Sequence, residues 1–177
     1  MRDDLSGLEK ESYSEFLAAV KRNMDPGSNT VLVVDDDRGI RKKVMRDIAK
    51  CDPEIVVDEA SDGADAMKTL AEMRQKYERD PLFIVLDLNM PVKDGWEVIS
   101  ELKEEYEQQG RVTGIPIVVL SSTSGEKGRF FGRRSIHDGK SGYEPLVAIA
   151  KEACIDNKRY DAQGQEGLVD WLRYFLK

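Results

Sequence analysis

Short apolar runs alternate along this chain with amphipathic stretches. The runs are rich in β-branched residues and are bounded by residues that favour turns, which is typical of strands. Runs that are apolar at nearly every position indicate burial on both faces of a parallel sheet. The predicted strands cover residues 31–34, 54–60, 83–87 and 115–120.

Between these runs, apolar residues recur at the spacing of one helix face. The pattern predicts one helix that begins near Asp37, a second over residues 64–77, and a third that begins at Gly95. The strict βαβαβαβ alternation predicts an α/β fold with a doubly wound parallel sheet. The residues expected on the buried faces are Ile40, Val44, Met45 and Ile48, then Ala66, Met67, Leu70 and Met73, and then Val98, Ile99, Leu102 and Tyr106.

The two ends of the chain are predicted separately. Ser12 and Glu15 match a helix capping box, and an apolar stripe from Tyr13 to Met24 predicts an N-terminal helix. We interpret residues 1–28 as this helix and its linker, and residues 29–177 as one domain. Residues 144–153 are predicted to be helical, residues 154–161 to hold a short, polar fifth strand, and Leu168, Val169, Leu172 and Phe175 to face inward from a closing helix.

Carboxylates follow two of the predicted strands. Asp35, Asp36 and Asp37 end the first apolar run, and Asp87 ends the third. Ligands of open α/β sheets bind outside the carboxyl ends of the strands, so these acids are expected to converge there. Such a cluster repels itself unless a positive group occupies it, and a hard divalent cation is the natural occupant.

Composition narrows the class of protein. The net charge of −7 argues against general nucleic-acid binding, and no apolar run approaches the roughly 20 residues of a membrane helix. With one histidine and two distant cysteines, a zinc site is not expected. The N-terminus lacks the apolar core of a secretory signal, so a reduced, cytoplasmic protein is the simplest interpretation.

The ordered set of motifs resembles the receiver domain of two-component response regulators. The motifs are Asp35-Asp36 after the first strand, Asp87 after the third, Met90-Pro91 and Asp94-Gly95 beyond it, and Ser121 after the fourth. The resemblance implies a flavodoxin-like, five-stranded sheet of order 2-1-3-4-5. The segments 86–91 and 120–124 also resemble the stand-alone receivers that serve phytochrome-type sensor kinases.

The resemblance implies a role for each site residue. Asp87 would accept a phosphoryl group, Asp36 and Asp87 would bind Mg²⁺ directly, and Asp35 would bind it through water. The backbone carbonyl of Asn89 would complete the protein ligands, and Ser121 would donate its hydroxyl to a phosphoryl oxygen. Phosphoryl transfer depends mainly on positioning and charge neutralisation, which is what such residues supply.

The family pattern also requires a lysine after the fifth strand, where this chain departs from it. Lys158 is the first choice, because it precedes the closing helix, but Arg159 follows it where the family usually has proline. Ile155 occupies the place of the expected aromatic switch residue. Lys151 is the weaker candidate, because it falls on the predicted helix over residues 144–153.

Residues 125–143 form the part of the chain least like the family. This insertion has five glycines and a local charge of +3, which results from five Lys and Arg residues against Glu126 and Asp138. One hypothesis makes it a partner-docking element, with Phe130 and Phe131 as apolar anchors. The alternative is a solvated loop that only lengthens the connection.

Other interpretations remain for single residues and for the whole chain. Asp35 or Asp36 alone could cap a helix, and Asp87 alone could belong to a turn. A pseudo-receiver that binds partners without phosphorylation is the main alternative function. A haloacid-dehalogenase phosphatase would need Thr or Val where Gly39 stands, and a nucleotide-binding Rossmann domain would need a glycine-rich turn where the acids stand.

We therefore predict a single-domain response regulator rather than a conventional enzyme, although a receiver catalyses its own phosphotransfer and dephosphorylation. The partners implied are a sensor histidine kinase or histidine phosphotransfer protein and a downstream protein target, with a homodimer as a further candidate. Output is expected through protein contacts, without nucleic acid or membrane.

Overall fold

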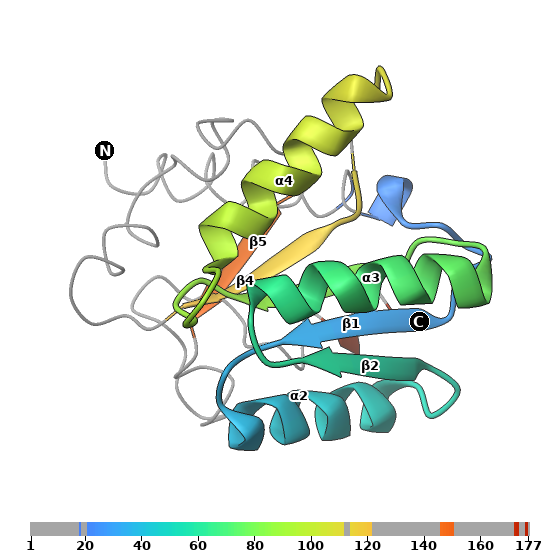
Figure 1. The fold of residues 1–177 in the computed structure, drawn as a ribbon. Coiled ribbons are helices and arrows are strands. Elements are labelled where there is room, and N and C mark those ends of the chain that lie inside the picture. Colours follow the sequence, from blue (N-terminus) through green and yellow to red (C-terminus); the bar gives the residue numbers. More distant parts are fainter. Residues whose placement is uncertain are drawn as a thin grey trace, which may run out of the picture.

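The computed structural model describes residues 21–111, 114–121 and 146–150, together with residues 18, 172, 173 and 176. Within these residues a parallel sheet is sandwiched between helices (Figure 1). The strands follow the order β2-β1-β3-β4-β5, in which β1 and β3 are neighbours at the centre. The elements are β1 (Thr30–Val34), α2 (Arg38–Cys51), β2 (Val56–Ala60), α3 (Gly63–Tyr77), β3 (Phe83–Asp87), α4 (Gly95–Gln108), β4 (Ile117–Ser121) and β5 (Leu146–Ala150).

The apolar runs of the sequence form strands because both sides of each run are covered. All five residues of β1 and all five of β3 are buried. Alternate residues of one strand point to opposite faces of the sheet, so each strand contributes to two separate cores. The doubly wound, parallel α/β sheet predicted from the apolar runs is confirmed.

One core lies between the sheet and helices α3 and α4. It joins Leu32 and Val34 of β1 and Ile84 of β3 to the apolar faces of the two helices. On α4 the four residues predicted to face inward are buried, and on α3 the buried apolar residues are Ala66, Leu70 and Met73. Met67 packs against this core from a partly buried position. The helical periodicity therefore predicted these two faces correctly.

The other core lies between the sheet and α2. It contains Val31 and Val33 of β1, Val44 and Ile48 of α2, and Leu172, which was predicted to face inward from the closing helix. Ile40 packs here from a partly buried position, and Met45 is also partly buried. Burial of Asp47 in α2 was not predicted. Its carboxylate accepts hydrogen bonds from the ammonium group of Lys43 at 2.6 and 2.8 Å.

The fifth strand contradicts the sequence-based prediction. Residues 146–150 pair with β4 in parallel register, from Leu146 against Ile117 to Ala150 against Ser121. The predicted helix over residues 144–153 is therefore wrong, because hydrogen bonding to β4 selects a strand for a short apolar run that periodicity alone leaves ambiguous. The predicted strand over residues 154–161 lies outside the described residues.

Several further predictions also fall on residues that the structure does not describe. These include the insertion at 125–143, Lys151 and Lys158, and most of the predicted N-terminal helix, of which Ala18 and residues 21–23 are helical. The boundary between residues 28 and 29 stays a prediction. Within the described residues, no helix is both long enough and apolar enough to cross a bilayer.

Candidate phosphoryl-acceptor and metal site

Three carboxylates meet at the carboxyl edge of the sheet. Oxygen atoms of Asp35, Asp36 and Asp87 all lie within 4.8 Å of one another. Parallel pairing of β1 with β3 brings them together, because Val34 lies opposite Leu86. Asp35 and Asp36 directly follow β1, and Asp87 is the last residue of β3. The convergence predicted for these acids is therefore confirmed.

Burial differs sharply within this cluster. The side chains of Asp35 and Asp87 are 0% and 1% exposed, whereas Asp36 is exposed to solvent. Main-chain groups hold one oxygen of each buried carboxylate, because Asp37 donates its N–H to Asp35 Oδ1 at 2.9 Å and Asn89 donates its N–H to Asp87 Oδ1 at 3.2 Å. These bonds fix the orientation of the two buried groups.

The donor set fits a hard divalent cation. The clustered donors are all carboxylate oxygens, the ligand type that Mg²⁺ and Ca²⁺ prefer, and there is no sulfur or imidazole among them. Buried carboxylates are costly unless a positive charge compensates them. A site with few carboxylates and one solvent-facing side suits Mg²⁺, which keeps several of its waters.

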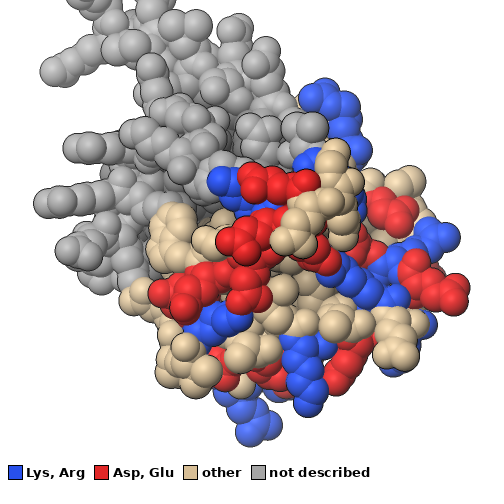
Figure 2. All heavy atoms as spheres, turned by 45° about the horizontal axis from the view of Figure 1, so that its top comes forward, with Lys and Arg blue, Asp and Glu red and all other residues tan. Residues whose placement is uncertain are grey.

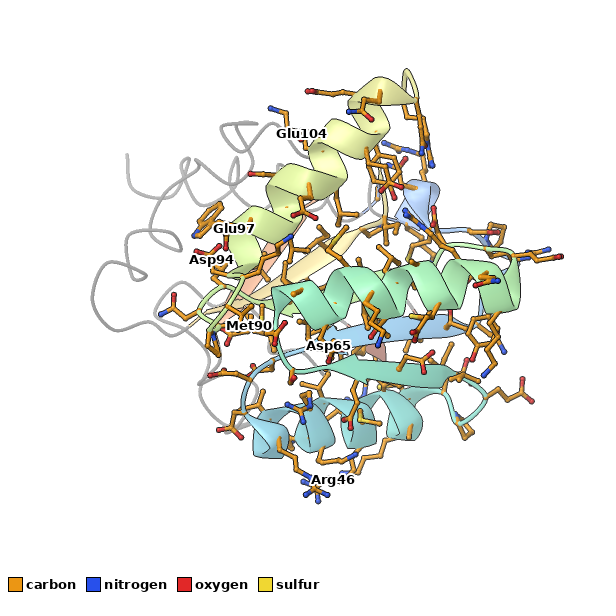
Figure 3. The ribbon with its side chains drawn as sticks, viewed as in Figure 1. Arg46, Asp65, Met90, Asp94, Glu97 and Glu104 are labelled. Carbon is orange, nitrogen blue, oxygen red and sulfur yellow. The ribbon has the colours of Figure 1, made fainter. Side chains whose placement is uncertain are left out.

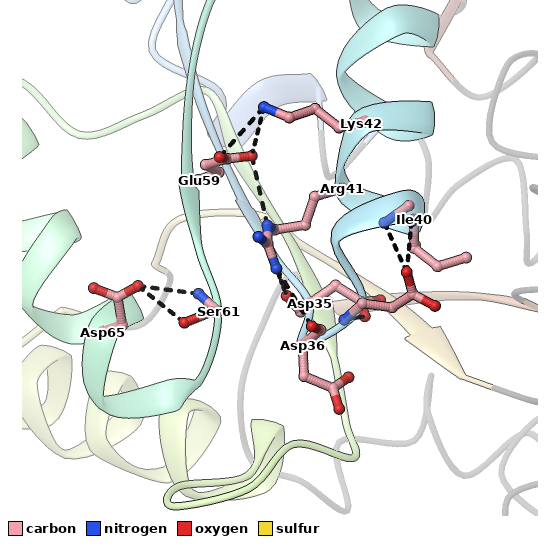
Figure 4. A network of polar contacts seen from close by, with 10 residues as sticks. Asp35, Asp36, Ile40, Arg41, Lys42, Glu59, Ser61 and Asp65 are labelled. Atoms are coloured by element: carbon pink, nitrogen blue, oxygen red, sulfur yellow. Dashed lines mark hydrogen bonds and ion pairs between the residues drawn. The ribbon is translucent and has the colours of Figure 1, made fainter.

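Asp37 has a different role from its two neighbours. It caps α2, because its Oδ1 accepts the main-chain N–H groups of Gly39 at 2.7 Å and Ile40 at 3.2 Å. The helix-cap role that was considered for Asp35 or Asp36 therefore belongs to Asp37, and Asp35 and Asp36 lie in the turn before the helix (Figure 4).

The loop between β3 and α4 is tightly folded just beyond Asp87. Val92 has φ of 69°, a left-handed conformation that is rare for a β-branched residue, and its side chain is 84% exposed. Lys93 closes a three-residue turn around it by donating its N–H to the carbonyl oxygen of Pro91 at 2.8 Å. Strained turns of this kind persist where the surrounding structure holds them and often lie at functional sites.

Two helices brace this loop. Gly63, the first residue of α3, donates its N–H to the carbonyl oxygen of Lys93 at 2.9 Å. Asp94 and Glu97 form a capping box at the first turn of α4, where Figure 3 shows both side chains above Met90. The Asp94-Gly95 motif of the sequence thus starts a helix directly behind the predicted acceptor.

Of the remaining predicted site residues, the structure describes Asn89 and the backbone of Ser121. Ser121 ends β4 one position beyond Leu120, which pairs with Asp87, so its backbone lies at the same edge of the sheet as the acids. Asn89 follows Asp87 in an exposed position and donates its N–H to it. The structure does not describe Lys158, so its assignment stays a prediction.

The position of β5 bears on the choice between the two lysines. Lys151 was judged weaker because it fell on a predicted helix, but β5 ends at Ala150, so Lys151 is the residue directly after the fifth strand. The argument against it no longer holds. Both lysines are therefore open candidates for the role that the family pattern assigns after β5.

Arg41 was not predicted from the sequence to lie near the site. In the structure its guanidinium lies against the β1–α2 turn, where Nη1 donates to the carbonyl oxygen of Asp35 at 2.7 Å. The available signal was weak, because an arginine in the first turns of an amphipathic helix is usually a solvent-facing residue.

The described part of one face of the molecule has side chains of both charges on its surface (Figure 2). On the face shown in Figure 2, Asp and Glu side chains gather in a band, and Lys and Arg side chains form smaller groups around it. Nucleic-acid-binding surfaces have the opposite pattern, with a basic patch or stripe. This face therefore gives no support to a nucleic-acid interface.

Comparison with known proteins identifies the protein family to which this chain belongs. The sheet has the strand order β2-β1-β3-β4-β5 with an acidic edge, and the sequence model of the response regulator receiver domain matches residues 31–132. The chain belongs to the response regulator receiver family of two-component systems.

Relatives and solved structures agree with this assignment. The chain is 36% identical over 111 residues to the transcriptional regulatory protein PrrA of Mycobacterium tuberculosis, an alignment that covers 62% of this chain and 42% of PrrA. It is 35% identical over 97 residues to a protein-glutamate methylesterase/protein-glutamine glutaminase of Caldanaerobacter subterraneus, covering 54% of this chain and 23% of that protein. The chain thus spans less than half the length of these relatives.

Among solved structures, the phosphorylated cyanobacterial phytochrome response regulator RcpA has the same fold. The TM-score is 0.54 at 23% sequence identity, over 84% of this chain and 91% of RcpA. At this identity the similarity concerns the fold alone.

Proposed function

We propose that this protein is a response regulator whose Asp87 receives a phosphoryl group from a phosphohistidine, in a reaction that depends on Mg²⁺. The donor would be a sensor histidine kinase or a histidine phosphotransfer protein. The observation that carries the proposal is the convergence of Asp35, Asp36 and Asp87 within 4.8 Å at the carboxyl edge of a receiver fold.

The chemistry follows from the positions of these groups. One carboxylate oxygen of Asp87 attacks the phosphorus atom and forms an acyl phosphate, while the P–N bond to the donor histidine breaks and the leaving imidazole takes up a proton. The three carboxylates of the cluster would hold a Mg²⁺ ion, whose positive charge would let the two anions approach each other. Asp87 is oriented for this role by the N–H of Asn89.

The other residues act around the acceptor. Asp36 and Asp87 would hold the cation directly and Asp35 would hold it through water. The carbonyl of Asn89 would add a ligand, and the hydroxyl of Ser121 would donate to an oxygen of the bound phosphoryl group. A lysine after β5, either Lys158 or Lys151, pairs with the same charge. The new charge shifts a two-state equilibrium in the nearby surface, through which the protein engages a downstream protein target.

Phosphorylation of purified protein with labelled acetyl phosphate, with and without Mg²⁺, tests the proposal. Wild-type protein should take up label only with Mg²⁺, and Asp87→Asn should keep its fold and lose the label, because it lacks the nucleophile. Asp58→Asn is the matched control, since it makes the same substitution in β2 outside the cluster, and it should be labelled normally.

Two results would contradict the proposal. Label that persists on Asp87→Asn and maps to another aspartate would assign the acceptor elsewhere. Wild-type protein that takes up no label in Mg²⁺, and does not respond to beryllofluoride, would favour the pseudo-receiver that acts only by binding.

A further inference from the structure

Arg41 joins three parts of the fold beside the acidic cluster. From the second turn of α2, its Nη1 donates to the carbonyl oxygen of Asp35 at 2.7 Å and lies 3.5 Å from that of Asp36. Its Nε lies 3.5 Å from Oε2 of Glu59 on β2. Figure 4 shows the guanidinium between Glu59 and the β1–α2 turn. The side chain of Arg41 is only 12% exposed.

The neighbouring Lys42 provides a useful contrast. Its ammonium group also pairs with the carboxylate of Glu59, at 3.3 Å, but its side chain is 46% exposed. Exposed ion pairs of this kind contribute little to stability. Arg41 differs because its planar fork can satisfy main-chain carbonyls and a carboxylate at the same time.

The two carbonyl groups belong to the residues that supply the cation ligands. The turn is also tied to β2 by the N–H of Asp35, which donates to the carbonyl oxygen of Ala60 at 3.2 Å. Arg41 thus adds a second tie to the same turn, through the carbonyl groups of Asp35 and Asp36. If this segment rotated, the carboxylates of Asp35 and Asp36 would move, and Mg²⁺ tolerates little departure from octahedral geometry.

We propose that Arg41 is a positioning residue for the cation site, which it organises through the main chain of the β1–α2 turn without touching the ion. The inference rests on the proposed function, because it assumes that the cluster binds Mg²⁺. It adds a residue that acts through the ligands and is not itself a ligand.

The charge of Arg41 and its positioning role predict opposite changes in Mg²⁺ affinity when Arg41 is replaced by an uncharged residue. A guanidinium near the cluster repels a cation, so electrostatics alone predicts that Arg41→Gln binds Mg²⁺ more tightly. Positioning predicts weaker binding, because the turn loses the group that holds its carbonyls. Loss of comparable outer-shell partners costs about tenfold or more in metal affinity.

Titration calorimetry of the full chain with Mg²⁺ separates these effects. We expect Arg41→Gln to raise the dissociation constant for Mg²⁺ about tenfold. Arg41→Lys keeps the charge but loses the fork, and it should also weaken binding. Lys42→Gln is the matched control on the same helix, and its dissociation constant should stay within about twofold of that of the wild type.

Unfolding in urea with EDTA measures stability separately from metal binding. A merely structural role for Arg41 would lower stability and leave the Mg²⁺ affinity of the folded protein unchanged, which would overturn the inference. Equal or tighter Mg²⁺ binding by Arg41→Gln would also overturn it. If Arg41→Gln does not fold, the Mg²⁺ affinity of Arg41→Lys decides on the same criterion.

The design also distinguishes this inference from the function on which it rests. If wild-type protein does not bind Mg²⁺, the proposed function fails and the role of Arg41 fails with it. If the wild type binds Mg²⁺ and is phosphorylated while both Arg41 variants bind Mg²⁺ equally well, only the role of Arg41 is refuted.

Discussion

Gly95 offers a direct test of how closely α4 is packed against the predicted acceptor. A Cβ atom at this position would lie 2.4 Å from the carbonyl oxygen of Asp87 and 2.8 Å from the Cα of Leu88. Both are backbone atoms, so neither can move aside by changing a rotamer. The N–H of Gly95 donates to the carbonyl oxygen of Leu88 at 3.0 Å, which holds the helix at this distance.

The expected cost of Gly95→Ala follows from two opposing terms. Overpacking a tightly packed site costs about 1–3 kcal/mol. Replacing glycine by alanine in a helix returns up to about 1 kcal/mol. We therefore expect a net loss of about 1–2 kcal/mol, which lowers the melting temperature by about 5 °C in a domain of this size.

Urea unfolding followed by circular dichroism, in EDTA so that no metal contributes, measures this loss. Gly39→Ala is the control, because its Cβ would meet only the Asp37 Oδ1 atom at 3.0 Å, a side-chain atom that can shift. It should lose no more than about 0.5 kcal/mol, since a small shift of the cap is partly offset by the gain in helix propensity.

Gly95→Ala should also slow phosphorylation of the protein that remains folded, because the carbonyl group that its Cβ displaces belongs to Asp87 itself. Labelling with acetyl phosphate in Mg²⁺ checks this, with Gly39→Ala labelled at the wild-type rate. The reasoning is refuted if Gly95→Ala is as stable as the wild type, because the close approach would then impose no constraint.

The remaining predictions concern the cation and the lysine. Asp36→Ala should stabilise the protein in EDTA, because it removes one of the carboxylates that repel each other. It should also abolish the rise in melting temperature that Mg²⁺ produces by binding the folded protein, and an unchanged rise would exclude Asp36 as a ligand. Alanine at the lysine that pairs with the phosphoryl charge should abolish the thermal shift produced by beryllofluoride but preserve Mg²⁺ binding. We expect this loss for one of the two variants Lys158→Ala and Lys151→Ala and not for the other, which assigns the role; a normal shift in both variants would show that neither lysine pairs with the phosphoryl charge.

The sequence by itself determined the strands that form the site and the residues at their ends. Residues 31–34 and 83–86 are apolar at every position, and such runs are stable only when buried on both faces. Parallel pairing then brings the carboxyl ends of both strands to one edge, whatever the details of packing. For that reason Asp35, Asp36 and Asp87 could be predicted together.

Helices with a strong stripe were equally predictable. The face of α4 follows from the spacing of Val98, Ile99, Leu102 and Tyr106, all of which are buried. Polar residues on helices were harder, because their default position is solvent. Asp47 is buried beside Lys43, and the side chain of Arg41 contacts the β1–α2 turn. Neither contact can be predicted from the spacing of apolar residues along α2.

The tertiary structure alone decided the features that depend on contacts distant in sequence. Residues 146–150 form a strand because β4 offers an unpaired edge, although their local pattern is equally compatible with a helix. Gly95 is restricted by the backbone of Asp87, and Arg41 reaches carbonyls that precede its own helix. Periodicity records which side of an element is apolar, whereas these features depend on which neighbour packs against it and how closely.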